Sequence, residues 1–189
     1  MATSGQLVSI TSKALRVSAV SVLVYYRELR SAGLVSKSGR GVSASHMTAL
    51  DAARLLIAMM GARIAKEVPD TVRTVGQFRQ TGSEVDFVRP VTPSDALQPG
   101  HRFEDGLAKV LSDLAGIPVT QSTVDQHIAL GASVSREEAV ARLALVDGFL
   151  RYEGEPTRPS RARGMTRTSR VYADALIRIS RALPPAGGR

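Results

Sequence analysis

Apolar side chains recur at helical spacing in two segments near the start of the chain, residues 6–15 and 19–32. In the second segment they fall on one face of a helix: Val22, Tyr26 and Leu29. Residues 16–18 would form the turn between the two helices, and Gly33 favours the left-handed conformation that ends a helix. The spacing therefore predicts a helix-turn-helix.

A glycine-rich segment follows the second predicted helix. Residues 34–42 contain Gly39-Arg40-Gly41 and predict a small hairpin, or wing, because glycine adopts turn conformations that other residues resist. Together with the preceding helices, the segment resembles winged helix-turn-helix repressors of the GntR type at these positions: Ser18, Val22, Leu29, Gly33-Leu34-Val35 and Gly39-Arg40-Gly41. The resemblance covers residues 14–42 and implies a winged domain that binds DNA.

Residues 48–61 predict a third helix, which Thr48 would cap and Asp51 would stabilise in its first turn. Apart from Arg54, the helix is apolar almost all round: Ala52, Ala53, Leu55, Leu56, Ile57, Ala58, Met59 and Met60. Such a helix must be buried, either behind the helix-turn-helix or against a second copy of the chain. We expect it to complete the core as the third helix. The apolar surface left over, together with the last helix, would form a homodimer interface.

The rest of the chain alternates apolar stripes with glycine and proline. Residues 67–102 predict a connecting segment in which Thr81 to Gly100 form a loop. Four elements are expected next: a helix over 103–114, a strand over 128–134, a helix over 135–146 opened by the capping box Ser135-x-x-Glu138, and a strand over 149–152. A mobile loop over 154–165 and a last helix from Ser169 complete the chain.

These elements predict an α+β fold that is mostly helical and has three parts. Residues 1–66 would form a winged helix-turn-helix DNA-binding domain, and residues 67–102 would connect it to the remainder. Residues 103–189 would form a small α-β-α-β domain with a final helix, serving dimerisation or regulation. The length of 189 residues is enough for a stable core in this arrangement.

Charge is distributed unevenly along the chain. Residues 1–66 carry nine basic and two acidic side chains, residues 67–157 carry eight basic and fourteen acidic, and residues 158–189 carry eight basic and one acidic. A chain that is basic at both ends and acidic in the middle has a directional field, which steers a polyanion towards particular surfaces. The charge pattern therefore favours nucleic acid as a partner.

We accordingly expect a sequence-specific, double-stranded DNA-binding transcriptional regulator of bacterial or phage type. Its second helix would enter the major groove and present four residues near base edges: Ser18, Ala19, Ser21 and Tyr25. Phosphates would be contacted by Lys13, Arg27, Arg30 and Lys37, and the minor groove by Arg40 at the tip of the wing. Two alternatives remain open: a phage DNA-packaging or replication-initiation protein, and an adaptor that binds an acidic protein instead of DNA.

Little in the sequence points to catalysis. The absence of cysteine excludes disulfides, thiolate metal sites and cysteine nucleophiles, and His46, His101 and His127 lack a second ligand at helical spacing. The longest apolar stretch, Leu55 to Met60, is far shorter than the ~20 residues of a membrane span, and no leader sequence is visible. We therefore expect a cytoplasmic protein that is not an enzyme and has no metal, cofactor or membrane partner. A small-molecule effector is left open.

Overall fold

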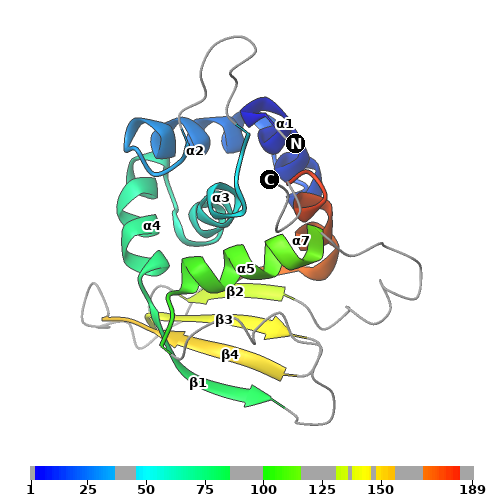
Figure 1. Ribbon diagram of the computed structural model, residues 1–189. Coiled ribbons are helices and arrows are strands. Elements are labelled where there is room, and N and C mark those ends of the chain that lie inside the picture. The colour runs from blue at the N-terminus through cyan, green and yellow to red at the C-terminus, as the bar shows by residue number, and fades with distance from the viewer. Residues whose placement is uncertain are drawn as a thin grey trace.

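The fold is α+β, with a layer of helices above a five-stranded antiparallel sheet (Figure 1). The computed structural model describes residues 3–36, 46–85, 100–115, 131–135, 138–145, 148–155 and 168–183. The elements in chain order are α1 (Ser4–Leu15), α2 (Ala19–Ser31), α3 (Ala49–Gly61), the short 3-10 helix η2 (Ala65–Glu67), α4 (Val68–Gly76), β1 (Arg79–Val85), α5 (Phe103–Ala115), β2 (Gly131–Ser135), β3 (Val140–Leu145), β4 (Gly148–Glu153), β5 (Thr168–Tyr172) and α7 (Ala173–Ser180).

Local capping signals explain where the first three helices begin and end. Thr3 and Thr48 close capping boxes at the starts of α1 and α3, with Gln6 and Asp51 as their partners. Gly33 follows α2 with a φ of 70°, and the amides of Gly33 and Leu34 donate back to two carbonyls of the last turn, those of Arg30 and Leu29. The predicted positions of all three helices are confirmed.

Helix α3 lies at the centre of the helical layer, where Figure 1 shows it end-on among the other helices. It contacts α2, α4 and α5, and it also reaches β2 and β5. Three of its large apolar side chains are fully buried, namely Leu55, Leu56 and Ile57, while Leu50 and Met59 are partly buried. Of the two predicted alternatives, burial within its own chain is the one observed for most of the helix.

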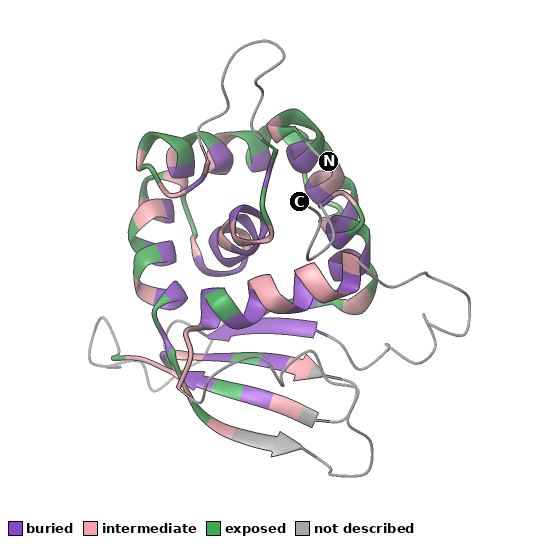
Figure 2. Ribbon diagram, viewed as in Figure 1, coloured by how far each residue is buried: buried purple, intermediate pink, exposed green. Residues whose placement is uncertain are grey.

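The sheet covers the helical layer from one side, with the strand order β1-β4-β3-β2-β5. Alternate residues of the strands turn towards the helices. In Figure 2 buried positions alternate with exposed or partly exposed ones along β3 and β4, whereas β2 is buried throughout. The buried strand residues on this inner face are Ala132, Val134, Ala141, Leu143, Leu150, Tyr152 and Val171. The sheet thus shares one hydrophobic core with the helices.

The helix predicted over residues 135–146 is wrong. Ser135 is the last residue of β2, and residues 140–145 form β3, which pairs with β2 as a hairpin. In β3 the side chains of Ala141 and Leu143 are buried while Arg142 is exposed, which is the alternation of a strand. Ala139, with a φ of 52°, lies in the turn. The capping-box pattern occurs in the sequence, but strand pairing overrides it.

Two further strands differ from the sequence-based prediction. Residues 79–85 were expected to lie in the connecting segment, but they form β1, an edge strand paired with β4. The last helix was expected from Ser169, but residues 168–172 form β5 on the opposite edge and α7 begins at Ala173. In place of the α-β-α-β order expected over residues 103–189, the described parts of this range form α5, the strands β2 to β5, and α7.

Helices from the two ends of the chain lie against each other. Helix α7 packs on α1 and α5, and its apolar stripe is buried there: Ala175, Leu176 and Ile179. These contacts, with those between α3 and α5, cross the predicted boundaries at residues 66 and 102. They also cover the second surface on which the expected homodimer rested. The wing over 34–42 lies outside the described residues from 37 onward, as does the predicted loop from residue 156 onward.

Gly106 provides a test of how α5 packs on the sheet. A Cβ at this position would lie 2.3 Å from the Tyr152 Oη and 3.1 Å from the Leu143 Cδ1, both fully buried side chains. We expect Gly106→Ala to lower the free energy of unfolding by ~1–3 kcal/mol, the usual effect of overpacking a core. Urea unfolding followed by circular dichroism measures the change.

The matched control is Gly5→Ala in α1, where an added Cβ has no neighbour within 4 Å. Alanine is the better helix former by roughly 1 kcal/mol, so this variant should be as stable as the parent or more so. Equal destabilisation by both substitutions would contradict the close approach of α5 to the sheet.

Candidate nucleic-acid interface

Helices α1 and α2 are joined by a tight turn of three residues. Arg16 takes the left-handed conformation with a φ of 55°, and the Val17 amide donates to the Ser12 carbonyl over 3.1 Å. The Ser12 hydroxyl donates in turn to the Val17 carbonyl over 2.7 Å. Ser18 caps α2, because its hydroxyl accepts a hydrogen bond from the Val20 amide over 3.2 Å. The turn is therefore held by hydrogen bonds on both sides.

The two faces of α2 differ sharply in exposure. Its inner face carries the three predicted core residues, all buried: Val22, Tyr26 and Leu29. On the outer face Val20 is 69% exposed, and Val17 and Leu23 are each 36% exposed. Ser18, Ala19 and Ser21 are exposed as well. The first half of α2 and the turn before it therefore form an accessible surface with an apolar centre.

Tyr25 does not belong to that accessible surface. It is only partly exposed, and its hydroxyl donates a 3.4 Å hydrogen bond to the carbonyl of Ala62, just beyond α3. One helical turn separates Tyr25 from the buried Val22 and Leu29, which places it beside the core face of α2. Of the four residues expected near base edges, three are accessible and Tyr25 faces the rest of the protein.

Basic side chains surround this apolar centre. Lys13 and Arg16 are exposed at the end of α1, and Arg27 and Arg30 are exposed further along α2. Within residues 3–36 of the sequence the sole acidic residue is Glu28. Lys37 and Arg40, the other two predicted contacts, lie outside the described residues. The potential at this surface is therefore positive.

Sequence reasoning missed Arg16 and Val20 as members of this surface. The sequence places Arg16 in the turn, and the structure leaves it exposed there. Val20 is not among the predicted contacts. The signal that could have found it is its spacing of two residues from the buried Val22, which places it on the opposite side of the helix.

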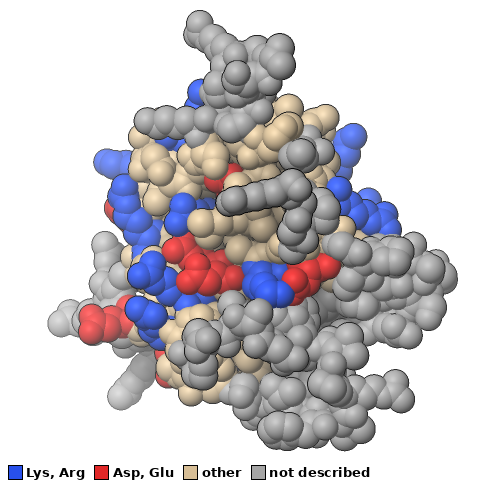
Figure 3. Space-filling view, viewed as in Figure 1, with Lys and Arg blue, Asp and Glu red and all other residues tan. Residues whose placement is uncertain are grey.

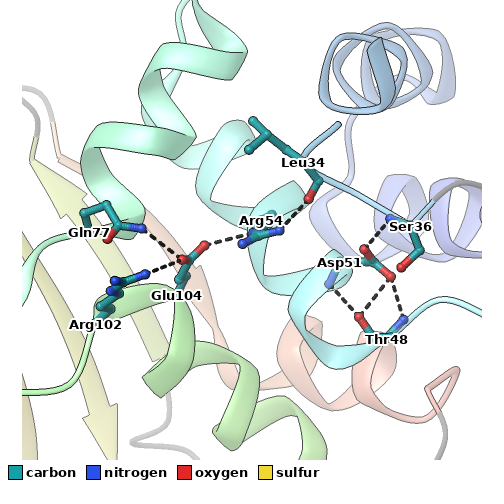
Figure 4. Close-up of polar contacts among 8 residues, drawn as sticks. All are labelled: Leu34, Ser36, Thr48, Asp51, Arg54, Gln77, Arg102 and Glu104. Carbon is teal, nitrogen blue, oxygen red and sulfur yellow. Dashed lines mark hydrogen bonds and ion pairs between the residues drawn. The ribbon is translucent and has the colours of Figure 1, made fainter. Parts of the chain in front are cut away.

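A polar network behind α2 fixes the chain that leaves this helix (Figure 4). Asp51, which is buried, accepts hydrogen bonds of 2.8 Å from the Ser36 amide and 2.8 Å from the Thr48 amide. The Thr48 hydroxyl lies 2.9 Å from the same carboxylate. One carboxylate thus joins residue 36, near the start of the predicted wing, to residue 48 beyond the wing.

Arg54, one turn further along α3, extends the network to α5. Its guanidinium donates one hydrogen bond of 2.8 Å to the Leu34 carbonyl and another of 2.8 Å to the Glu104 carboxylate. Glu104 is buried, and its carboxylate also accepts a 3.1 Å hydrogen bond from the side-chain amide of Gln77. The guanidinium of Arg102 lies 4.0 Å from the same carboxylate. The charged head of Glu104 is therefore paired, which is what a buried carboxylate requires. These contacts tie the α1 to α3 unit to the sheet side of the protein.

A second polar pair lies between α5 and the sheet, where the His101 Nε2 and the Tyr152 Oη are 2.7 Å apart. Tyr152 is fully buried, and this burial raises the pKa of its hydroxyl above the usual range, with the charge of Asp105 adding to the rise. The hydroxyl therefore stays protonated near neutral pH. The pair serves packing, and the described residues contain no group of three potential metal ligands.

Charge on the surface follows the uneven distribution along the sequence. In the view of Figure 3 acidic side chains gather over α5, and basic side chains stand along both flanks of the helical layer. The acidic residues of α5 are Glu104, Asp105 and Asp113. Two of these three residues are paired with cations, Glu104 with Arg54 and Asp113 with Lys109, so α5 carries little net negative charge.

Comparisons with known proteins give no family for the chain. No protein-family model, curated protein or solved structure matches it. Among the described residues no helix is long and apolar enough to cross a membrane. The functional interpretation therefore depends on the geometry and chemistry of the surface itself.

Asp51 allows a test of the polar network behind α2. We expect Asp51→Ala to lower the free energy of unfolding by ~2–3 kcal/mol, because it leaves two backbone amides without their acceptor and removes a helix cap. The control is Asp70→Ala, at an exposed first-turn carboxylate of α4 that pairs with Arg73 over 3.4 Å. An exposed pair of this kind contributes less than ~1 kcal/mol. Denaturant titration of both variants should separate them, and similar losses would show that the network adds nothing to stability.

Proposed function

We propose that the chain binds double-stranded DNA in a sequence-specific way, through the turn after α1 and the exposed face of α2, as a transcriptional regulator of bacterial or phage type. The observation that carries the proposal is the accessible first half of α2 with four exposed cations around it: Lys13, Arg16, Arg27 and Arg30. A helix of this kind fits the major groove, and basic side chains beside it position it on the phosphates.

The roles of the surface residues differ in this proposal. The cations would contact phosphates and set the orientation, without distinguishing one sequence from another. Ser18, Ala19 and Ser21 would lie near base edges, and the exposed Val20 would join them in place of Tyr25. An apolar side chain in the major groove contacts the methyl group of thymine. Arg40 stays the candidate for the minor groove.

A second candidate function is supported by the apolar centre of the same surface. Val17, Val20 and Leu23 are exposed together, and an exposed apolar patch with a polar rim is typical of protein interfaces. Because its rim is basic, the fitting partner would be an acidic protein, which corresponds to the adaptor alternative. Unrelated duplex DNA added in excess would compete with DNA binding and leave an apolar protein interface intact.

Salt dependence gives the first test of DNA binding. Each phosphate contact contributes about −0.9 to the slope of log K against log salt, so four contacts predict roughly −3.6 per chain. Duplexes selected from a random library, labelled and titrated by fluorescence anisotropy between low and moderate salt, provide the measurement. Sedimentation of the complex gives the number of chains, which tests the homodimer expected from the sequence. A flat salt response, or no binding to any duplex, would refute the proposal.

Arg27→Ala provides the second test. We expect duplex binding to weaken by ~1 kcal/mol or more on every sequence, with a slope about 0.9 less steep, because one phosphate contact is lost. The matched control is Arg73→Ala, at an exposed arginine of α4 that is absent from the proposed surface. Thermal unfolding verifies that both variants are folded. If Arg27→Ala and Arg73→Ala change duplex binding equally, α2 is not the interface.

A further inference from the structure

Three arginines lie in one row across the outer face of the sheet. Strand register places Arg170 of β5 opposite Ser133 of β2, Ser133 opposite Arg142 of β3, and Arg142 opposite Arg151 of β4. Residues directly opposite each other in an antiparallel pair share a face. Arg142, Arg151 and Arg170 are exposed and most of their neighbours along the strands are buried, so the three arginines face away from the helices. Ser133, which lies between Arg170 and Arg142, is itself buried, as is every residue of β2.

A second row on the same face carries aromatic residues at its two ends. Tyr172 of β5 is opposite Gly131, Gly131 is opposite Ala144, and Ala144 is opposite Phe149 of β4. Tyr172 is 63% exposed, and Phe149 is partly exposed. Each lies two residues along its strand from an arginine of the first row. Small residues therefore separate the two rings, and both rings adjoin the arginines.

The arginine row is electrostatically unfavourable for the protein alone. Arg142 and Arg151 are directly opposite, and like charges in that position destabilise a strand pair. Strand register places two acidic residues on this face: Glu153, which pairs with Arg151 over 2.7 Å, and Glu84 of β1, which is opposite Phe149. Arg142, which is exposed, has no partner among the described residues that would neutralise it. An anion bound along the row would remove this repulsion.

The dimensions of the two rows suit a chain that carries both phosphates and flat rings. Adjacent strands are ~4.8 Å apart, so Arg142 is about one strand spacing from Arg151 and two from Arg170. The aromatic row lies two residues away along the strands, ~7 Å. In a nucleotide the base and the phosphate are several ångströms apart. A base could therefore lie on the aromatic row while its phosphate lies at the arginine row.

We propose that the outer face of the sheet binds single-stranded nucleic acid, with bases stacked on Tyr172 and Phe149 and phosphates held by Arg142, Arg151 and Arg170. A single strand is the fitting occupant because its bases are free to stack on exposed rings, whereas a duplex keeps them paired inside. This surface is separate from the proposed duplex site. Figure 1 shows α2 and the sheet on opposite sides of α3 and α5.

The experiment titrates the full chain with fluorescent 20-residue oligonucleotides, dT and rU, and with a duplex of the same length. We expect Arg142→Ala to weaken single-strand binding at least fivefold and to reduce its salt slope by about 0.7, the contribution of one phosphate contact to a single strand. Tyr172→Ala should weaken it at least fivefold through lost stacking, and Tyr172→Phe should restore it. Oligonucleotide binding that both substitutions weaken supports the proposal, and the ratio of dT to rU affinity identifies the preferred sugar.

Stability distinguishes a binding role from a structural one. Since Arg142→Ala removes a like-charge pair, its thermal midpoint should equal or exceed that of the parent protein while its single-strand affinity falls. Arg73→Ala, on α4, should change neither quantity. A loss of binding that parallels a loss of stability in the Arg142 and Tyr172 variants would overturn the proposal.

Crossed variants separate this proposal from the proposed function. Arg27→Ala should weaken duplex binding and leave single-strand binding unchanged, and Arg142→Ala should do the reverse. If Arg27→Ala weakens both, single strands bind at α2 and the sheet site is refuted while duplex binding stands. Inorganic polyphosphate that binds as tightly as the oligonucleotides, with no effect of Tyr172→Ala, would also refute it, because a general anion surface needs no aromatic row.

Discussion

Helix α3 carries so little polar surface that the other elements are arranged to keep it from water. It contacts helices α2, α4 and α5 and reaches the two strands β2 and β5 at one edge of the sheet. Hydrophobic burial has no direction, so it requires cover on every side without specifying which element provides it. The arrangement of the helical layer around α3 follows from this one requirement.

The two charged side chains of α3 supply the direction that apolar contact lacks. Asp51 joins the residues on either side of the segment 37–47, and Arg54 connects Leu34 to Glu104 of α5. Buried charges tolerate few geometries, because each must keep its partners or pay the cost of an unpaired ion. The position of α2 relative to α5, and hence of the proposed duplex surface relative to the sheet, depends on these contacts.

Two candidate surfaces for nucleic acid arise from different properties of the chain. The surface on α1 and α2 comes from cations close together in the sequence, so charge counting over the first 66 residues already indicated it. The surface on the sheet comes from Arg142, Arg151 and Arg170, which lie in a row only because three strands pair in one register. Arg142 and Arg151 lie within residues 67–157, which are acidic in total, so no count along the sequence points to a basic face around them.

The sequence by itself determined α1, α2 and α3, because capping residues, Gly33 and the 3.6-residue apolar period all act within a few residues of the helix that they define. It also identified the inner residues Val22, Tyr26 and Leu29. Only the tertiary structure decided that residues 140–145 form a strand, that Tyr25 turns towards Ala62, and that Arg142 is opposite Arg151. The physical reason is that strand pairing and side-chain burial are contacts between distant parts of the chain, and local sequence encodes neither the partner nor the register.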